Sequence, residues 1–302
     1  MAISPPFLKE GDLILVLSPS GVVDKKKVEN GIEILKEKGF KIEISKNTFN
    51  AYFKFGSSHE NRLSDLQNAL DHPEAKAIYC ARGGFGITHI LDDLDWTKFK
   101  ENPKWIIGFS DITALLNVTY KKGFASLHAS VLQGLSKLDS QYQTSIFDCL
   151  KGKVDKMEAK SKFNKNGEGT GSLIGGNLSL LVNQIGTRSE LDYRGQILFI
   201  EEVAEPLYHI DRMFLQLKRA NKLKDLAGLV VGQFTNLIED KSIYGQSLEE
   251  IILAHCKEYD FPIGFNFPFG HGEDNHSIVH GAKVNMKVRD KESEISYGVS
   301  PQ

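Results

Sequence analysis

The stretch KWIIGFSDITALLNVTYKKG, from Lys104 to Gly123, decides the fold. Its first residues, through Gly108, are typical of a buried strand, and a helical pattern begins with Asp111 without an intervening spacer. Strand followed by helix recurs from Asp12 to about Leu150, with further strands in LILVL, FKIEIS and KAIYC. This alternation predicts an α/β domain with a parallel sheet covered by helices on both faces.

The chain changes in character after residue 150. The segment 151–171, KGKVDKMEAKSKFNKNGEGTG, is rich in lysine and glycine and predicts a surface linker. Strands are expected in GQILFIEEV and LAGLVVGQF, and the segment AKVNMKVRDKESEISYG predicts a terminal hairpin. The expected organisation is an N-terminal α/β domain over 1–150, a linker over 151–171, and a C-terminal domain of strands and helices over 172–302.

Two Ser-x-x-Glu patterns predict helix starts by a capping box. They are Ser57 with Glu60 and Ser247 with Glu250. In such a box the serine side chain and the glutamate side chain each accept a backbone N–H at the first turn.

Composition excludes several classes of protein. The chain has 302 residues with 37 Lys+Arg and 39 Asp+Glu, a net charge of −2, so it lacks the basic excess that nucleic-acid binding requires. No segment approaches the roughly 20 apolar residues of a membrane span, and the short apolar run after Asp12 does not fit a secretory signal. The three separated cysteines, Cys80, Cys149 and Cys256, predict buried free thiols. We therefore expect a cytoplasmic protein with neither nucleic acid nor membrane as partner.

The first candidate site is the turn GFSD at Gly108–Asp111. A serine between a strand and a helix is presented at the carboxyl end of the sheet, where the helix N-terminus offers N–H groups to an oxyanion, as in a nucleophile elbow. The usual G-x-S-x-G pattern is incomplete, because its last position is Ile112. Capping of the helix by Ser110 or Asp111 is the alternative.

The second candidate site is the loop ARGGFG, which also follows a strand. Its glycines, Gly83, Gly84 and Gly86, allow close approach of a ligand to the backbone, and Arg82 is suited to bind a carboxylate. A dinucleotide fingerprint fails because His89 replaces the third glycine. A plain glycine turn with Arg82 in a surface ion pair stays open.

Glu201 and His271 are the candidates of the second half. Glu201 ends an apolar strand, where a buried carboxylate needs a partner, although a solvated loop charge is the common alternative. His271 lies between two glycines and is a suitable general base. A metal site is the rival interpretation, on five residues of the same loop: His271, Glu273, Asp274, His276 and His280. The loop lacks H-E-x-x-H and a helix to align ligands, so we expect no metal.

Ser110, Glu201 and His271 together would form a serine-hydrolase triad. In it His271 deprotonates Ser110, and Glu201 holds the imidazole in the required tautomer.

The ordered motifs GDLILVLSPSG, ARGGFG, GFSDITALL, GSLIGGNLS, LFIEEVAEPLYHIDR, VVGQF and PFGHGEDN resemble those of the LD-carboxypeptidase family of serine peptidases, which includes microcin-immunity peptidases. The resemblance runs from about Gly11 to about Gly281. It implies Ser110 as nucleophile, Glu201 and His271 as its partners, and an oxyanion hole from the N–H groups of Gly84 and Asp111. It also implies an N-terminal α/β domain, a mostly β C-terminal domain, a homodimer, and neither metal nor cofactor.

The substrate implied by the resemblance is a cytoplasmic muropeptide tetrapeptide, which loses its terminal D-Ala after an L-centre diamino acid during peptidoglycan recycling. Arg82 is the candidate for binding the substrate's terminal carboxylate. Asn177 is expected either to shape the site or to act as a plain N-cap. Glu202 stands where the family prefers aspartate.

Three other functions stay open at this point. The first is a microcin-immunity-type peptidase acting on an aminoacyl-nucleotide toxin, and the second is a non-catalytic peptide-binding protein. The third is a metallohydrolase built on the histidine loop.

Overall fold

The computed structural model describes residues 2–154, 156–238 and 241–298. The predicted domain ends at residues 1 and 302, and residue 155 of the predicted linker, lie outside these ranges. The described chain forms two compact units. The N-terminal unit contains residues 2–153 and 276–281, and the C-terminal unit contains the described residues of 154–275 and from 282 onward.

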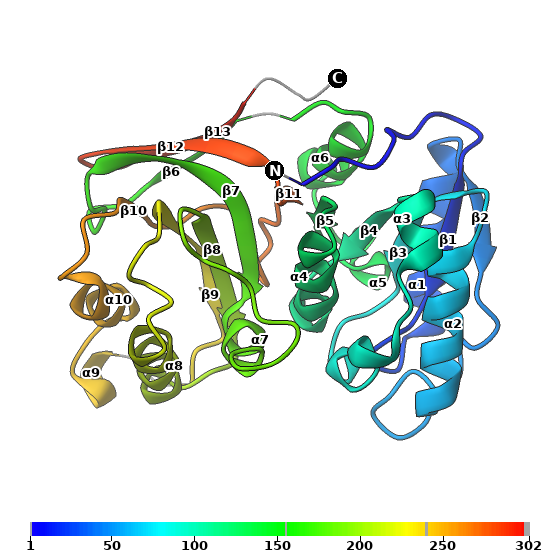
Figure 1. The fold of residues 1–302 in the computed structure, drawn as a ribbon, viewed down its shortest axis with the longest axis horizontal. Helices are drawn as coiled ribbons and strands as arrows, with labels where there is room; N and C mark the ends of the chain where they lie inside the picture. The colour runs from blue at the N-terminus through cyan, green and yellow to red at the C-terminus, as the bar shows by residue number, and fades with distance from the viewer. Residues whose placement is uncertain (1, 155, 239–240, 299–302) are drawn as a thin grey trace. The chain divides into compact units, whose positions relative to one another are not determined.

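The N-terminal unit is built on a six-stranded sheet in the order β11-β5-β4-β3-β1-β2 (Figure 1). Its five N-terminal strands pair in parallel, and β11 is antiparallel to β5. The strands are β1 (Leu13–Leu17), β2 (Lys41–Ile44), β3 (Ala75–Cys80), β4 (Trp105–Gly108), β5 (Ser126–His128) and β11 (Ile278–His280). The predicted parallel α/β sheet is confirmed.

Helices connect these strands. They are α1 (Lys25–Glu37), α2 (His59–Asp71), α3 (Thr97–Glu101), α4 (Thr113–Lys121), α5 (Leu132–Leu135) and α6 (Ser140–Leu150), with short 3-10 turns at Ile87–His89, Leu91–Asp93 and Ser110–Ile112. Contacts join α1 to α5 and α2 to α3. The strand order reverses between β1 and β3, and ligands of open α/β sheets bind outside the carboxyl ends of strands at such a reversal.

The C-terminal unit has a seven-stranded sheet in the order β10-β9-β8-β7-β12-β13-β6. Strands β7 to β10 are parallel, whereas β12, β13 and β6 continue the sheet as antiparallel strands. The strands are β6 (Met157–Lys160), β7 (Gly167–Asn177), β8 (Ile197–Val203), β9 (Gly228–Thr235), β10 (Ile263–Gly264), β12 (Lys283–Arg289) and β13 (Glu292–Tyr297). The helices are α7 (Leu178–Asn183), α8 (Leu207–Arg219), α9 (Lys241–Tyr244) and α10 (Leu248–Cys256). Contacts join α8 to both α7 and α10, and the terminal hairpin β12–β13 is confirmed.

The segment 151–171 differs from the predicted linker, because it contains β6 and the first part of β7. Its lysines and glutamates alternate with buried residues such as Met157 and Ala159, so they line the solvent face of a paired strand. Its glycines serve close packing: a Cβ on Gly171 would lie 2.5 Å from the carbonyl oxygen of Gly195. A polar, glycine-rich composition therefore marks strand residues that alternate between a buried and an exposed face here.

A second difference is the return of the chain to the N-terminal unit at residues 276–281, which we expected in the C-terminal domain. Strand β11 pairs with β5, and the His280 Nε2 lies 2.9 Å from the Asn117 Oδ1 of α4. Both side chains are completely buried, so this pairing belongs to the core of the unit.

One of the two predicted capping boxes is present. Ser247 and Glu250 form both hydrogen bonds at the start of α10. The prediction for Ser57 is wrong, because Ser58 caps α2 by accepting the N–H of Asn61. The side chain of Ser57 instead accepts a hydrogen bond from the Asn61 side-chain amide.

The three cysteines are buried free thiols, as predicted. Within the described ranges, no helix has the length and apolar character that a membrane crossing would need.

Candidate active site

Ser110 lies on a strained turn between β4 and α4. Its φ is +62°, in the left-handed region that a residue with a side chain rarely adopts. The preceding Gly108 leaves room for the turn, because a Cβ there would lie 2.9 Å from the side chain of Ile112. Strain of this kind on a strand-to-helix turn is the geometry of a nucleophile elbow.

The turn is fastened to the loops that follow β1 and β3. The Asp111 carboxylate is 2% exposed and accepts hydrogen bonds from the Ser20 Oγ at 2.7 Å and from the Ile87 N–H at 2.9 Å. Burial raises the pKa of Asp111, while these two hydrogen bonds and the charge of Arg62 oppose that rise. Asp111 therefore joins three loops at the carboxyl edge of the sheet through its side chain.

The ARGGFG loop lies directly against the serine. A Cβ on Gly83 would be 3.0 Å from the Ser110 Cβ, and the Gly83 carbonyl accepts the N–H of Gly21 at 3.0 Å. Gly84 has a φ of +99°. Arg82 does not point freely outward, since one of its guanidinium nitrogens donates to the carbonyl of Val22.

Glu201 and His271 form a hydrogen-bonded pair within the C-terminal unit. The His271 Nδ1 lies 2.5 Å from the Glu201 Oε2, and the Glu201 side chain is completely buried. Because a carboxylate only accepts, Nδ1 is the donor, and in this neutral tautomer the lone pair of the ring lies on Nε2.

Local backbone features bring this pair together. Along the β8–β9 pairing the register shifts between Ile200 and Glu202, so that one residue of β8 faces two of β9. Such an irregularity re-aims side chains near active sites. The loop of His271 adds to β9 by a parallel bridge between Gln233 and Gly270. A Cβ on Gly270 would lie 3.0 Å from the Glu201 Cβ, and its φ is +125°, so only glycine fits.

The pKa of His271 is raised above its ordinary value. Burial alone would lower this pKa, but the charge of Glu201, its hydrogen bond and the charge of Glu202 outweigh the effect of burial. The imidazolium is thus stabilised by two neighbouring carboxylates, which is what a general base needs after it accepts a proton.

Glu202 and Asn177 form a second network beside the pair. The Glu202 carboxylate, 2% exposed, accepts the Asn177 Nδ2 at 2.7 Å, the Ser179 N–H at 2.8 Å and the Val203 N–H at 2.9 Å. Asn177 is the N-cap of α7, as the plain-cap alternative predicted, and is buried. Burial raises the pKa of Glu202, against the effect of these hydrogen bonds.

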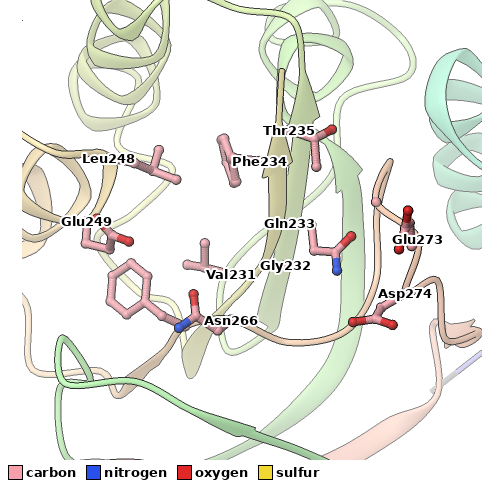
Figure 2. Close-up of a pocket in the computed structure, with 12 residues that line it drawn as sticks. Val231, Gly232, Gln233, Phe234, Thr235, Leu248, Glu249, Asn266, Glu273 and Asp274 are labelled. Atoms are coloured by element: carbon pink, nitrogen blue, oxygen red, sulfur yellow. The ribbon is translucent and has the colours of Figure 1, made fainter. Parts of the chain in front are cut away.

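A cavity of about 530 Å³ lies at the carboxyl end of β9. Figure 2 shows the Gln233 side chain directed towards the loop of Glu273 and Asp274. This loop begins directly after His271. The opposite wall includes Leu248 and Glu249 of α10. The loop that follows His271 thus forms part of the wall of this cavity, within its own unit.

The histidine loop does not form the metal cluster considered above. His271 pairs with Glu201, whereas the His280 ring bonds Asn117 in the N-terminal unit. Among the described residues, no group of three or more His, Cys, Asp or Glu side chains is arranged to hold a metal ion.

Sequence reasoning missed the side-chain roles of Asp111 and Glu202 and the contribution of Ser20. The SPSG motif after β1 contains Ser20, but the pairing of this serine with Asp111 spans 91 positions and has no local signature. Adjacent glutamates at the end of an apolar strand were the available signal for Glu202.

Comparisons with known proteins match both units. Residues 14–129 match the LD-carboxypeptidase N-terminal domain, and residues 170–286 match the LD-carboxypeptidase C-terminal domain. The chain is 32% identical to a probable murein peptide carboxypeptidase of Bacillus subtilis, over 98% of this chain and 95% of that protein.

Solved structures agree with these matches. The muramoyltetrapeptide carboxypeptidase of Oxalobacter formigenes aligns with a TM-score of 0.88 and 25% identity, covering 96% of this chain and all of that one. An MccF-like protein of Bacillus anthracis aligns with a TM-score of 0.86 and 26% identity, covering 98% of this chain and all of that one. The chain therefore belongs to the LD-carboxypeptidase family of peptidases.

Proposed function

We propose that this protein is a serine-type LD-carboxypeptidase that releases the terminal D-Ala from muropeptide tetrapeptides. The observation that carries the proposal is the buried Glu201–His271 pair, whose hydrogen bond of 2.5 Å holds the imidazole by its Nδ1. The strained turn at Ser110 and the similarity to murein and muramoyltetrapeptide carboxypeptidases support the nucleophile and the substrate.

In the proposed reaction the Ser110 Oγ attacks the carbonyl carbon of the scissile bond, and its proton passes to the His271 Nε2. The N–H groups of Gly84 and Asp111 stabilise the oxyanion. His271 then gives the proton to the leaving nitrogen of D-Ala, which departs as the free amino acid. Water attacks the resulting ester of Ser110 by the same steps, and the shortened peptide is released.

Arg82 and Asn177 have different parts in this proposal. Arg82 keeps further guanidinium donors besides the one that binds Val22, and these are proposed to bind the terminal carboxylate of the substrate. Asn177 is proposed to position Glu202 and the start of α7 rather than to contact substrate, because its Nδ2 and Oδ1 already bond neighbouring groups.

The proposal includes a cytoplasmic role in peptidoglycan recycling and a homodimeric state. Light scattering of the purified protein tests the dimer, and cell fractionation tests the location.

Mass spectrometry of reaction products tests the activity. Wild type is expected to remove one D-Ala from a muropeptide tetrapeptide and to leave an all-L peptide intact, and Ser110→Ala is expected to be inactive on both. Stoichiometric labelling of Ser110 by a fluorophosphonate is expected for wild type. An intact tetrapeptide with an unlabelled serine would contradict the enzyme proposal and favour a peptide-binding protein.

The similarity to the MccF-like protein favours a second candidate, a microcin-immunity-type peptidase. An aminoacyl adenylate conjugate included in the same assay separates the two. If the conjugate is cleaved while the tetrapeptide stays intact, the protein would be assigned as a microcin-immunity-type peptidase.

A further inference from the structure

Aromatic side chains, three of them exposed, lie together in the loops at the carboxyl edge of the N-terminal sheet. We call Tyr52, Phe53, Phe55 and Phe85 the aromatic ridge. Phe53 is 86% exposed, and Tyr52 and Phe85 are 53% and 52% exposed. Large apolar side chains exposed together in this way mark a binding surface more often than scattered ones do.

Contacts between the rings hold the aromatic ridge in place. The rings of Tyr52 and Phe53 meet edge to face at 5.0 Å, and those of Phe55 and Phe85 lie 5.6 Å apart. Phe55 in turn lies over the buried guanidinium of Arg62, at 4.8 Å. Bridges from Phe55 to Tyr52 and Gly21 fix the loop to the segment after β1.

Phe53 also has a strained backbone, with a φ of +54°. An aromatic residue in the left-handed region costs free energy, and a ring that is 86% exposed recovers little of it by packing within the chain. The chain thus holds this ring in an unfavourable conformation facing solvent, which points to an occupant outside the chain.

The ridge adjoins the candidate nucleophile. Phe85 is two residues from Gly83, whose missing Cβ would lie 3.2 Å from the Ser110 Oγ. By standard backbone dimensions, the Phe85 Cα is within about 12 Å of that oxygen. Three extended residues span about 10 Å. A tetrapeptide cut before its last residue has three residues between the scissile bond and the group at its N-terminus.

We propose that the aromatic ridge binds the N-acetylmuramyl sugar of the substrate, with Phe53 and Phe85 stacking against the pyranose. This inference rests on the proposed function and deepens it, because it assigns the residues that recognise the sugar of the substrate. A pyranose presents C–H groups with partial positive charge, and an aromatic face carries partial negative charge. A nucleotide leaving group fits less well, because it is attached directly at the scissile bond and does not reach across three residues.

Kinetics on paired substrates test the proposal. The probes are N-acetylmuramoyl tetrapeptide and the same tetrapeptide without sugar. Wild type is expected to show a kcat/KM about tenfold higher for the glycopeptide, through a lower KM. The double variant Phe53→Ala with Phe85→Ala is expected to bring this ratio close to one. Ile243→Ala, which removes a side chain that is 73% exposed on α9, is the control and is expected to keep the wild-type ratio.

Binding separates failure of the subsite from failure of the proposed function. Calorimetry with the Ser110→Ala variant measures the affinity for both probes without turnover, and tighter binding of the glycopeptide that depends on the ridge is expected. Equal binding of the two probes, or a preference that survives in the double variant, would overturn the proposal even where both peptides are hydrolysed. Loss of a dimer in the double variant would assign the ridge to a second copy. If AMP competes with the glycopeptide for binding, and the double variant abolishes this competition, the ridge would be assigned to a nucleobase.

Discussion

The hydrogen bond between Glu201 and His271 fixes which nitrogen of the imidazole acts as base. Glu201→Gln replaces one acceptor oxygen by an amide that can turn a donor towards Nδ1, which favours the other tautomer. We expect kcat to fall by about 10³- to 10⁴-fold with little change in fold, as measured by steady-state kinetics and circular dichroism. A variant with activity within tenfold of wild type would remove Glu201 from the mechanism.

The two carboxylates near His271 predict the pH dependence of the reaction. The base must be neutral, so kcat/KM is expected to fall as pH drops through the raised pKa of His271. Because the charge of Glu202 contributes to that rise, Glu202→Gln is expected to move the acid limb of the profile to lower pH. A variant that only loses packing is expected to lower kcat/KM at every pH and to leave the midpoint of the acid limb unchanged.

Glu258→Gln is the charge control for this profile, because its exposed carboxylate bonds Lys218 and does not act on His271. Its acid limb is expected to coincide with that of wild type. An unchanged midpoint in Glu202→Gln would assign Glu202 a purely structural role.

At the scale of elements, the loop that carries His271 depends on a glycine. Gly270→Ala places a Cβ 3.0 Å from the Glu201 Cβ at a φ of +125°. We expect Gly270→Ala to lower the free energy of unfolding by about 1 to 3 kcal/mol. We also expect it to reduce activity, because the added Cβ displaces the Glu201–His271 pair. Gly186→Ala is the matched control, because Gly186 has a φ of +80° and no atom within 4 Å of the added Cβ. Equal effects of both variants on activity would show that strain alone, and not the crowding of Glu201, is responsible.

Elements with local signals could be predicted from the sequence, and elements that depend on distant partners could not. The box of Ser247 and Glu250 lies within one turn and was predicted correctly. Ser57 and Ser58 offer the same local chemistry, and the choice between them depends on the loop that precedes α2. The irregular register beside Glu201 has no signature in either strand, since it exists only in their pairing.

The same division holds for the whole molecule. Alternating strands and helices predict the parallel sheet of the N-terminal unit, because each βα repeat is local. Ser110, Glu201 and His271 could be singled out by their places at the ends of strands or between glycines. The return of residues 276–281 to the N-terminal sheet could not be predicted, because β11 pairs with a strand about 150 positions earlier and is only three residues long.

This return predicts that a histidine far along the chain stabilises the first sheet. His280→Ala removes a buried partner of Asn117 and leaves a cavity beside β5, so we expect the free energy of unfolding to fall by about 2 to 3 kcal/mol. His276→Ala is the control, because that ring is partly exposed and bonds only the adjacent Ser277 carbonyl, and its effect is expected within about 0.5 kcal/mol. Hydrogen exchange locates the change: in His280→Ala, the amides of β5 are expected to exchange faster while those of β13 keep wild-type protection. Faster exchange in β13 to the same extent as in β5 would mean that the two units lose stability together, and that β11 does not act through its own sheet.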